Sequence, residues 1–455
     1  MSEFDVAIVG GGPGGYVAAI RSAQLGLKTV LIERDAVGGT CLNIGCIPTK
    51  TLAKNAELIH EIESSGNRGL IIDNPVIDMP KTISMKNNIV AQLVGGVRIL
   101  LKRNGVTLIK GDARVLSGTS ISVNEEEIKF DHLIIATGSS NSIPPIPGLD
   151  RPGILTSTEI LELKYVPKNL LIIGGGVIGC EFATIFNSFG SKVTIVEAMP
   201  YILPLMDADV STAMKKGFTL SGIKALTNCK VTGVKKKDDS YAVMLQGADE
   251  EIVSVDEILV SVGRKPNLGG LDGINLEFEN QYIKVDDHMR TNLKNIYAIG
   301  DVTGRMQLAH VASAQGIIAA ENIAGKQSRM SYSAIPSCVY TIPEIGSVGL
   351  TEAQAKEQYD AISIGKFPMS ACGKAIAMGT ENGFAKIIAA KKDGKLLGCH
   401  IVGPNATEVI SGAVAVMQRQ GTIEDISHII HAHPTISESV LEAARAAMGD
   451  PIHIM

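Results

Sequence analysis

Two stretches of the chain share one order of apolar and polar positions. Each begins with a short apolar run, passes through a glycine-rich turn into a helical pattern, and returns to a second apolar run that ends at a glutamate. The first stretch extends from residues 5–9 to Glu33, and the second from residues 170–173 to Glu197. Runs this apolar are typical of strands buried on both faces, so the pattern predicts two βαβ units built on parallel strands.

The glycines of each turn have the spacing of a dinucleotide-binding fingerprint. In such a turn the first glycine permits a tight bend, the second admits a pyrophosphate, and the third lets helix and strand pack closely. The free N–H groups at the start of the following helix then attract the phosphates. The glycines at these positions are Gly10, Gly12 and Gly15 in the first turn and Gly174, Gly176 and Gly179 in the second.

An acidic residue closes the second strand of each unit. Glu33 follows the middle glycine of its turn by 21 positions, and Glu197 does the same in the second copy. We expect each carboxylate to accept hydrogen bonds from a ribose diol. A carboxylate also repels a 2′-phosphate, so Glu197 favours NAD over NADP. Two dinucleotide sites on one chain indicate electron transfer between two cofactors.

The remaining pattern completes an α/β fold with a different C-terminal part. Apolar strands break at glycine turns at residues 133–138 and 296–301. The other expected elements are helices over residues 48–103, a hairpin over residues 231–246 that turns at residues 235–239, strands near residues 337–340 and 385–390, and a helix that starts at the capping box of residues 351–354. The fold class is therefore α/β, with two Rossmann-like nucleotide-binding domains and a C-terminal α+β domain. The boundaries are residues 1–145 with 270–330 returning to them, residues 146–269, and residues 331–455.

Length and charge exclude several classes of protein. A chain of 455 residues exceeds one ordinary core and suggests about three domains. The net charge of −5 gives no basic footprint for nucleic acid. The N-terminal residues lack a basic segment typical of signal peptides, and no apolar run is long enough to span a bilayer. These features predict a cytoplasmic protein with no nucleic-acid or membrane partner.

Two of the seven cysteines are candidates for redox chemistry because of the residues around them. Cys41 and Cys46 stand five positions apart among glycines, and can close a small disulfide ring if the backbone bends or the helical turn is distorted. A position near a helix N-terminus lowers a thiol pKa, so one of the pair can persist as thiolate. No second Cys/His pair at ligand spacing supports a metal site. The other five are expected to be inert and buried: Cys180, Cys229, Cys338, Cys372 and Cys399.

Taken together, these features resemble the pyridine nucleotide–disulfide oxidoreductases, and within them the branch that oxidises dihydrolipoyl groups. The resemblance covers essentially the whole chain and rests on seven motifs in the family's order, at residues 10–15, 39–50, 136–138, 174–179, 262–267, 298–301 and 431–438. It implies FAD on the first turn and NAD on the second.

The resemblance also assigns residues to each cofactor. It implies that Asp301 binds the ribityl chain and that Lys50 and Glu181 lie near the reactive edge of the flavin. The full set implied for FAD is Gly10, Gly12, Gly15, Glu33, Lys50, Ala113, Thr137, Gly138, Ser139, Asp301, Gln307, Leu308, Ala309 and His310. The set for NAD is Gly174, Gly176, Gly179, Glu181, Glu197, Val231 and Gly263.

The resemblance implies the catalytic roles as well. Cys46 would lie against the flavin as a charge-transfer thiolate, while Cys41 exchanges with substrate. His433 would be the general base and Glu438 would orient it, both contributed by the partner subunit of a homodimer. Chemistry supports this, because thiol–disulfide exchange needs a base that titrates near neutral pH and a carboxylate that fixes its tautomer. His431 is interpreted as structural.

The implied substrate is a dihydrolipoyl group that we expect to arrive on another protein or as a free compound, because no lipoyl domain precedes the first strand. The carrier would be the lipoyl domain of an acyltransferase or an H-protein, which makes the chain the third component of a 2-oxoacid dehydrogenase or glycine cleavage complex. Residues 369–374 depart from the family's pattern by bringing in Cys372, for which no redox role is expected.

The sequence leaves alternative functions open. Glutathione, mercuric and coenzyme A disulfide reductases share the same motifs. Thr49 and Glu197 disfavour an NADP-dependent glutathione reductase, and the last ten residues lack the cysteine pair of a mercuric reductase. A non-catalytic, NAD-responsive partner protein is the alternative from another class, although intact Cys41, Cys46 and His433 speak against it.

Overall fold

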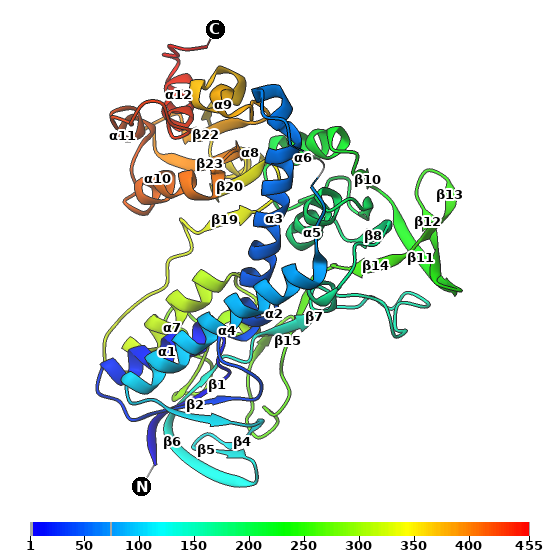
Figure 1. Cartoon of the computed structure of the whole chain (residues 1–455). Coiled ribbons are helices and arrows are strands. Elements are labelled where there is room, and N and C mark those ends of the chain that lie inside the picture. The colour runs from blue at the N-terminus through cyan, green and yellow to red at the C-terminus, as the bar shows by residue number, and fades with distance from the viewer. Residues whose placement is uncertain (1–2, 73–74, 455) are drawn as a thin grey trace. The chain divides into compact units, whose positions relative to one another are not determined.

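The computed structural model describes residues 3–72 and 75–454, which fall into two units (Figure 1). The first unit comprises Met1–Thr51, Pro80–Ser142 and Gly263–Ser331. The second comprises Leu52–Met79, Ile143–Val262 and Tyr332–Met455. The finer division into three domains stays a prediction.

The first unit is built on a parallel core extended by an antiparallel hairpin. β1 (Phe4–Val9) pairs in parallel with β2 (Thr29–Glu33) and with β6 (Glu126–Ile135). The sheet order is β3-β2-β1-β6-β5-β4, and β18 also pairs with β6. The additional strands are β3 (Thr107–Lys110), β4 (Ala113–Ser117), β5 (Ser120–Val123) and β18 (Ile296–Ala298), with small two-stranded sheets formed by β7 (Ser139–Asn141) and β15 (Arg264–Pro266), and by β16 (Phe278–Glu279) and β17 (Tyr282–Ile283).

Two helices of the first unit pack closely because glycines line their contact. α1 (Pro13–Gln24) and α7 (Ala309–Ile323) lie side by side (Figure 1). A Cβ at Gly316 of α7 would lie 2.5 Å from the carbonyl oxygen of Gly14 in α1, so only glycine permits this approach. The remaining helical segments that begin or end in this unit are α2 (Gly39–Ile44), α3 (Cys46–Ser64), α4 (Met79–Arg103) and η3 (Gly300–Thr303), with η1 (Ser65–Arg68) following α3.

The second unit repeats the same parallel arrangement. Its sheet has the order β10-β9-β8-β14, which corresponds strand for strand to β3-β2-β1-β6. The strands are β8 (Asn169–Ile173), β9 (Lys192–Val196), β10 (Lys224–Leu226) and β14 (Glu257–Val260), with helices η2 (Glu159–Glu162), α5 (Val177–Ser188) and α6 (Ala208–Leu220). The predicted hairpin is present as β11 (Lys230–Lys237) and β12 (Ser240–Gln246), joined by β13 (Glu250–Val255) in an antiparallel sheet.

The C-terminal part of the second unit is an antiparallel sheet covered by helices, so the expected α/β fold with an α+β C-terminal part is confirmed. The sheet order is β19-β20-β23-β22-β21. Its strands are β19 (Pro336–Val339), β20 (Glu344–Gly349), β21 (Ile362–Pro368), β22 (Phe384–Ala390) and β23 (Leu396–Gly403). The helices are α8 (Glu352–Gln358), η4 (Met369–Ala371), α9 (Gly373–Met378), α10 (Ala406–Gln418), α11 (Ile423–Ser427) and α12 (Glu438–Met448).

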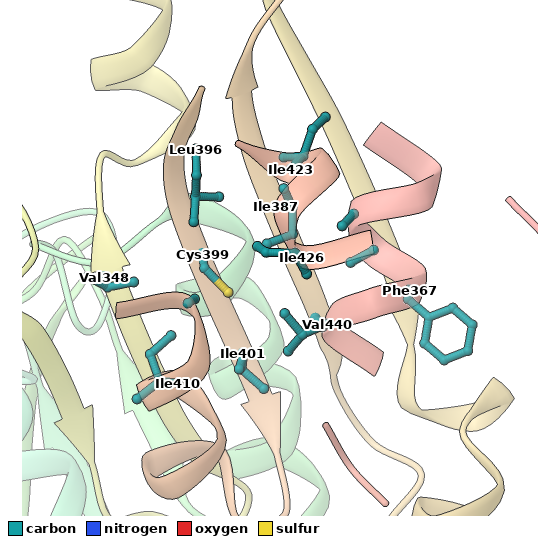
Figure 2. Packing of buried hydrophobic residues seen from close by; sticks show 14 of the residues in the cluster. Val348, Phe367, Ile387, Leu396, Cys399, Ile401, Ile410, Ile423, Ile426 and Val440 are labelled. Atoms are coloured by element: carbon teal, nitrogen blue, oxygen red, sulfur yellow. The ribbon is translucent and has the colours of Figure 1, made fainter. Parts of the chain in front are cut away.

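Apolar side chains fill the space between this sheet and its helices. Figure 2 shows Ile387 and Ile401 of the sheet facing Ile426 of α11 and Val440 of α12. Burial of each such side chain stabilises the fold by roughly 1.5–3 kcal/mol.

The predicted capping box is also present, since the Thr351 hydroxyl accepts from Gln354 N and the Gln354 side chain accepts from Thr351 N. In the described part of the chain, no helix combines the length and apolar character needed to cross a bilayer.

Candidate active site

The first glycine turn has the shape that a pyrophosphate needs. Gly10 adopts a φ of +105°, and a Cβ there would lie 2.2 Å from the Ala136 carbonyl oxygen. A Cβ at Gly15 would lie 1.8 Å from the Gly10 carbonyl oxygen. The middle glycine, Gly12, is open instead, because the nearest described atom would lie 3.9 Å from its Cβ. The outer glycines are therefore required by the fold, while the middle one leaves room for a ligand.

The second turn repeats this geometry. Gly174 has a φ of +106°, and a Cβ at Gly179 would lie 2.0 Å from the Gly174 carbonyl oxygen. At Gly176 no described atom would lie within 4 Å of a Cβ. Both turns fit a dinucleotide by the same criterion.

The two acids hold their turns through the same pair of bonds. Glu33 accepts from Gly11 N at 2.6 Å and from Asp35 N at 2.8 Å. Glu197 accepts from Gly175 N and from Met199 N, both at 2.7 Å. A carboxylate has about four acceptor sites, so each acid retains capacity for ribose hydroxyls.

The segment after Glu33 folds back over the first turn and brings the cysteines with it. Gly38 N donates to the Gly11 carbonyl oxygen at 2.7 Å. Gly39 has a φ of +53°, and a Cβ there would lie 2.6 Å from the Gly12 Cα atom. The start of α2 therefore rests directly on the middle glycine of the first turn, which is where the first dinucleotide is expected.

Cys41 and Cys46 face each other across a break between two helices. α2 ends at Ile44, Gly45 leaves the helical conformation (φ −145°, ψ −110°), and α3 begins at Cys46. The distorted helical turn that the spacing required is thus present. The pKa of the Cys41 thiol is raised, mainly by its hydrogen bond with Cys46 and then by burial, while the charge of Lys50 opposes this. Beside Cys46, the Cys41 thiol therefore favours its protonated form.

Arg264 is a residue of this site that received no role from the sequence, although its motif was recognised. Its guanidinium donates to the Ser139 hydroxyl at 2.7 Å and to Asn141 Oδ1 at 2.8 Å. Ser139 in turn donates to the Asp301 carboxylate. Partial burial lowers the pKa of Arg264, and the charges of Asp301 and Cys46 oppose this, so a half-buried cation lies near both groups. Only the pairing of β15 with β7, distant in sequence, brings them together.

Other residues implied for FAD also lie in the first unit. Thr137 donates its hydroxyl to the Asn267 carbonyl oxygen at 2.7 Å, and Gly138 accepts from Asn267 N at 3.0 Å with a φ of +68°. Leu308 precedes α7, so its neighbours Ala309 and His310 form the first turn of that helix. Ala113 opens β4 and pairs with Val123. The contact of these residues with a flavin stays a prediction, and so does the contact of Gln307.

The residues implied for NAD are divided between the units. Glu181 lies on α5, is 3% exposed, and accepts from Tyr340 N at 3.0 Å. Val231 lies on β11 with its side chain in the core, so only its backbone can reach a ligand. Gly263 belongs to the first unit and has a φ of +117°. Their roles toward NAD stay predictions.

The predicted base is assembled within the second unit. His433 Nδ1 lies 2.9 Å from Glu438 Oε1, and Glu438 Oε2 accepts from Thr435 N at 2.7 Å. Burial raises the pKa of Glu438, but hydrogen bonds from Thr435 and His433 outweigh it and lower the pKa overall. With Nδ1 held by the carboxylate, Nε2 is the nitrogen left to accept a proton. Burial lowers the pKa of the neighbouring His431, which is consistent with a neutral, structural residue.

The remaining cysteines are mostly buried, as expected. Cys180, Cys229, Cys372 and Cys399 are all buried, with Cys372 only 4% exposed and directed at the Thr435 carbonyl oxygen at 3.7 Å. Cys338 is only partly buried, so full burial was wrong for this one residue.

Comparisons with known proteins agree with this geometry. The model of the pyridine nucleotide-disulphide oxidoreductase family matches residues 4–316, and that of the family's dimerisation domain matches residues 335–444. The dihydrolipoyl dehydrogenase of Chlamydia muridarum (strain MoPn / Nigg) is 42% identical over 464 residues, covering 100% of this chain and 99% of the relative. The dihydrolipoyl dehydrogenase of Thermus scotoductus (strain ATCC 700910 / SA-01) is 41% identical over 466 residues, covering 100% of both.

Solved structures show the same likeness. LpdA from Mycobacterium tuberculosis has a TM-score of 0.89 at 28% identity, with 97% of this chain and 98% of that chain covered. The HOCl-induced flavoprotein disulfide reductase RclA from Escherichia coli has a TM-score of 0.87 at 30% identity, with 97% and 99% covered. The chain belongs to the pyridine nucleotide-disulphide oxidoreductase family.

Proposed function

We propose that this enzyme oxidises dihydrolipoyl groups to the cyclic disulfide with FAD and NAD as cofactors, in the cytoplasm. The observation that carries the proposal is the Cys41–Cys46 pair, hydrogen-bonded across a helix break that rests on the first dinucleotide turn. The full-length relatives named dihydrolipoyl dehydrogenase favour this substrate within the family.

The dithiol chemistry follows from the two sulfurs. With Cys41 and Cys46 joined as a disulfide, a substrate thiolate attacks Cys41 Sγ, which forms a mixed disulfide and releases Cys46 as thiolate. The second substrate thiolate attacks the substrate sulfur of the mixed disulfide. The substrate leaves as a cyclic disulfide, and Cys41 is released as the second thiolate. Two electrons have then moved from substrate to the cysteine pair.

Three groups manage the protons and charge of this exchange. His433 Nε2 accepts the proton of the first substrate thiol, releases it to solvent, and then accepts the proton of the second thiol. The Glu438 carboxylate stabilises the imidazolium through Nδ1 each time. The cation of Arg264 faces Cys46 and stabilises its thiolate. FAD and NAD, once bound, supply the chemistry that carries the two electrons away from the dithiol.

The cofactors are assigned to the two turns. FAD would be held by the first turn, with Glu33 on its ribose and Asp301 on its ribityl chain. NAD would be held by the second turn, with Glu197 on its ribose. In this proposal residues 1–145 and 270–330 form the FAD domain, residues 146–269 the NAD domain, and residues 331–455 the dimerisation domain.

The dimer and the substrate carrier belong to the same proposal. A homodimer would place His433 and Glu438 of one subunit against the cysteines of the other, so that each active site is shared. The dihydrolipoyl group would arrive on the lipoyl domain of an acyltransferase or on an H-protein.

The test is a spectrophotometric assay on the purified flavoprotein. Dihydrolipoamide should reduce the flavin, produce a long-wavelength charge-transfer band, and then drive NADH formation when NAD is added. Glutathione disulfide and coenzyme A disulfide, tested in parallel with NADH, should turn over far more slowly. Cys46→Ser should abolish the band and the turnover. Turnover that survives in this variant, or a preference for one of the other disulfides, overturns the proposal.

A further inference from the structure

The second unit contains a buried cluster of charges for which the proposed chemistry has no use. Lys386 of β22 is 1% exposed, and its ammonium donates to Asp207 at 2.8 Å, to Asp209 at 2.9 Å and to Glu352 at 2.7 Å. A buried lysine destabilises the folded state unless its charge is paired. Three carboxylates around one ammonium therefore indicate that Lys386 has a structural role at this position. The cluster joins the C-terminal sheet to the start of α6.

Asp207 is the residue through which the cluster reaches α6. Its side chain, 1% exposed, caps that helix by accepting from Asp209 N at 3.1 Å. Its other oxygen accepts from Glu352 N at 2.9 Å. Burial raises the pKa of Asp207, but the hydrogen bonds from Glu352 and Lys386 outweigh it, so the pKa is lowered and the carboxylate stays charged. The N-terminus of α6 is thus fixed against the C-terminal sheet from two sides.

Residues 198–206 connect this anchor to the second dinucleotide turn. Leu203 N donates to the Gly175 carbonyl oxygen at 2.7 Å, and a Cβ at Gly175 would lie 3.0 Å from Ile202 Cγ2, so the segment packs onto the turn. Leu203 also accepts from the Ser211 hydroxyl of α6 at 3.2 Å.

The conformation of this segment needs support from both ends. Leu203 has a φ of +50°, which is unfavourable for a residue that carries a Cβ and persists only where the surroundings impose it. At one end Met199 N is held by Glu197, and at the other Asp207 is held by Lys386. Release of the Asp207 end would let the segment relax away from the turn.

We infer that Lys386 and Asp207 are positioning residues for NAD: they hold residues 198–206 against the second turn and thereby fix Gly175 and Glu197. This inference rests on the proposed placement of NAD at that turn. It gives the C-terminal sheet a part in nucleotide affinity, although the hydrogen bonds of Lys386 go to Asp207, Asp209 and Glu352, which lie outside the turn.

The experiment compares two variants that each remove one carboxylate from the same lysine. Lys386 and Glu352 N both donate to Asp207. In Asp207→Asn the amide NH₂ group must face one of these two donors, so that hydrogen bond is lost and the end of residues 198–206 is released. Glu352→Gln removes the same charge but keeps its own backbone N–H bond to Asp207, which makes it the matched control. The dissociation constant for NAD is measured calorimetrically on the oxidised, FAD-loaded enzyme, together with KM for NAD, kcat and the unfolding temperature.

Asp207→Asn should raise the dissociation constant and KM for NAD by about 3- to 30-fold, while kcat at saturating NAD changes less than about twofold. Glu352→Gln should change the NAD affinity less than about twofold even if it lowers the unfolding temperature as much. Equal effects of the two variants on NAD affinity, or an unchanged affinity in a folded Asp207→Asn enzyme, overturn the positioning role. If Asp207→Asn does not fold, Ser211→Ala removes the hydrogen bond to Leu203 and should raise the dissociation constant by about 3- to 10-fold. A change of less than about twofold there overturns the role.

Glu197→Gln tests the underlying assignment separately. Its NAD affinity should fall because the carboxylate is the expected ribose ligand. An unchanged affinity in Glu197→Gln overturns the placement of NAD at the second turn, whereas an unchanged affinity in Asp207→Asn alone overturns only the positioning role of Lys386 and Asp207.

Discussion

Replacement of Glu438 by glutamine should leave the proposed base in place but give it the wrong tautomer. In the structure both carboxylate oxygens accept, one from His433 Nδ1 at 2.9 Å and one from Thr435 N at 2.7 Å. A glutamine has one oxygen and one NH₂ group. Because Thr435 N can only donate, the amide oxygen must face it and the NH₂ group must face His433. Nδ1 is then favoured as the acceptor and the proton favours Nε2, so the tautomer that can take a proton from a thiol at Nε2 becomes the less stable one.

The size of the effect follows from the bond that is lost. A hydrogen bond to a charged group contributes roughly 1.5–3 kcal/mol. The side chains of His433 and Glu438 are 79% and 29% exposed, and solvent screening reduces the contribution to roughly 1–2 kcal/mol. We therefore expect Glu438→Gln to slow reduction of the enzyme by dihydrolipoamide by roughly 5- to 30-fold. Stopped-flow measurement of flavin reduction gives this rate without any contribution from NAD.

A second histidine–carboxylate pair on the same helix provides the control. His453 Nδ1 lies 2.8 Å from Glu442 Oε1, and His453 N donates to the other oxygen at 3.3 Å. Glu442→Gln makes the same chemical change one turn further along α12, at a carboxylate that is bonded to His453 and not to His433, and should leave the rate within about twofold of the unmodified enzyme. A Glu438→Gln rate that is equally unchanged would refute the assignment of Glu438 as the group that orients the base.

Three further predictions concern the turns, the buried cluster and the extra cysteine. Gly176→Ala should fold normally, because its Cβ would meet no described atom within 4 Å, yet it should weaken NAD binding measured by calorimetry. Gly179→Ala should be unstable, because its Cβ would lie 2.0 Å from a carbonyl oxygen. Lys386→Met should lower the free energy of unfolding by about 3–5 kcal/mol in denaturant titrations, since it leaves Asp207 buried without its cation. Because the pKa of Asp207 is lowered on folding, its contribution is present above the ordinary aspartate pKa of about 3.9 and is lost as pH falls through the lower folded value, so a loss of stability on raising the pH through neutrality would contradict this account. Cys372→Ala should leave the charge-transfer band and turnover unchanged, since the thiol is buried in the core.

Local features of the site could be predicted because short-range rules determine them. The outer glycines of each turn leave no room for a Cβ, so their spacing alone predicted the turns. The break between Cys41 and Cys46 was also expected, because two cysteines five apart on an undistorted helix would not face each other. The pairing of His433 with Glu438 rested on the resemblance and is present in the structure.

Contacts between distant parts of the chain could not be predicted in the same way. Arg264 reaches Ser139 because β15 pairs with β7, which are separated by more than a hundred residues. Lys386 looks like an ordinary solvated lysine in a strand of apolar residues, and only the folded sheet shows it 1% exposed among three carboxylates. Neither pairing leaves a periodic signal in the sequence.

The two halves that contain the glycine turns share one backbone hydrogen bond, but the segments that make it differ in what they carry. In each, the segment that follows the acid folds back and donates an N–H to the carbonyl oxygen of the glycine before the middle one: Gly38 to Gly11 in the first half, and Leu203 to Gly175 in the second, both at 2.7 Å. In the first half the returning segment continues into α2 and carries Cys41 onto the turn. In the second it continues to Asp207 and is tied down by a charge cluster, with no nucleophile on it. In the proposed function, the half that would perform the thiol chemistry has its reactive groups on the returning segment. The half that would bind NAD has the corresponding segment fixed in place instead, which is why a lysine in the C-terminal sheet should affect the affinity for NAD.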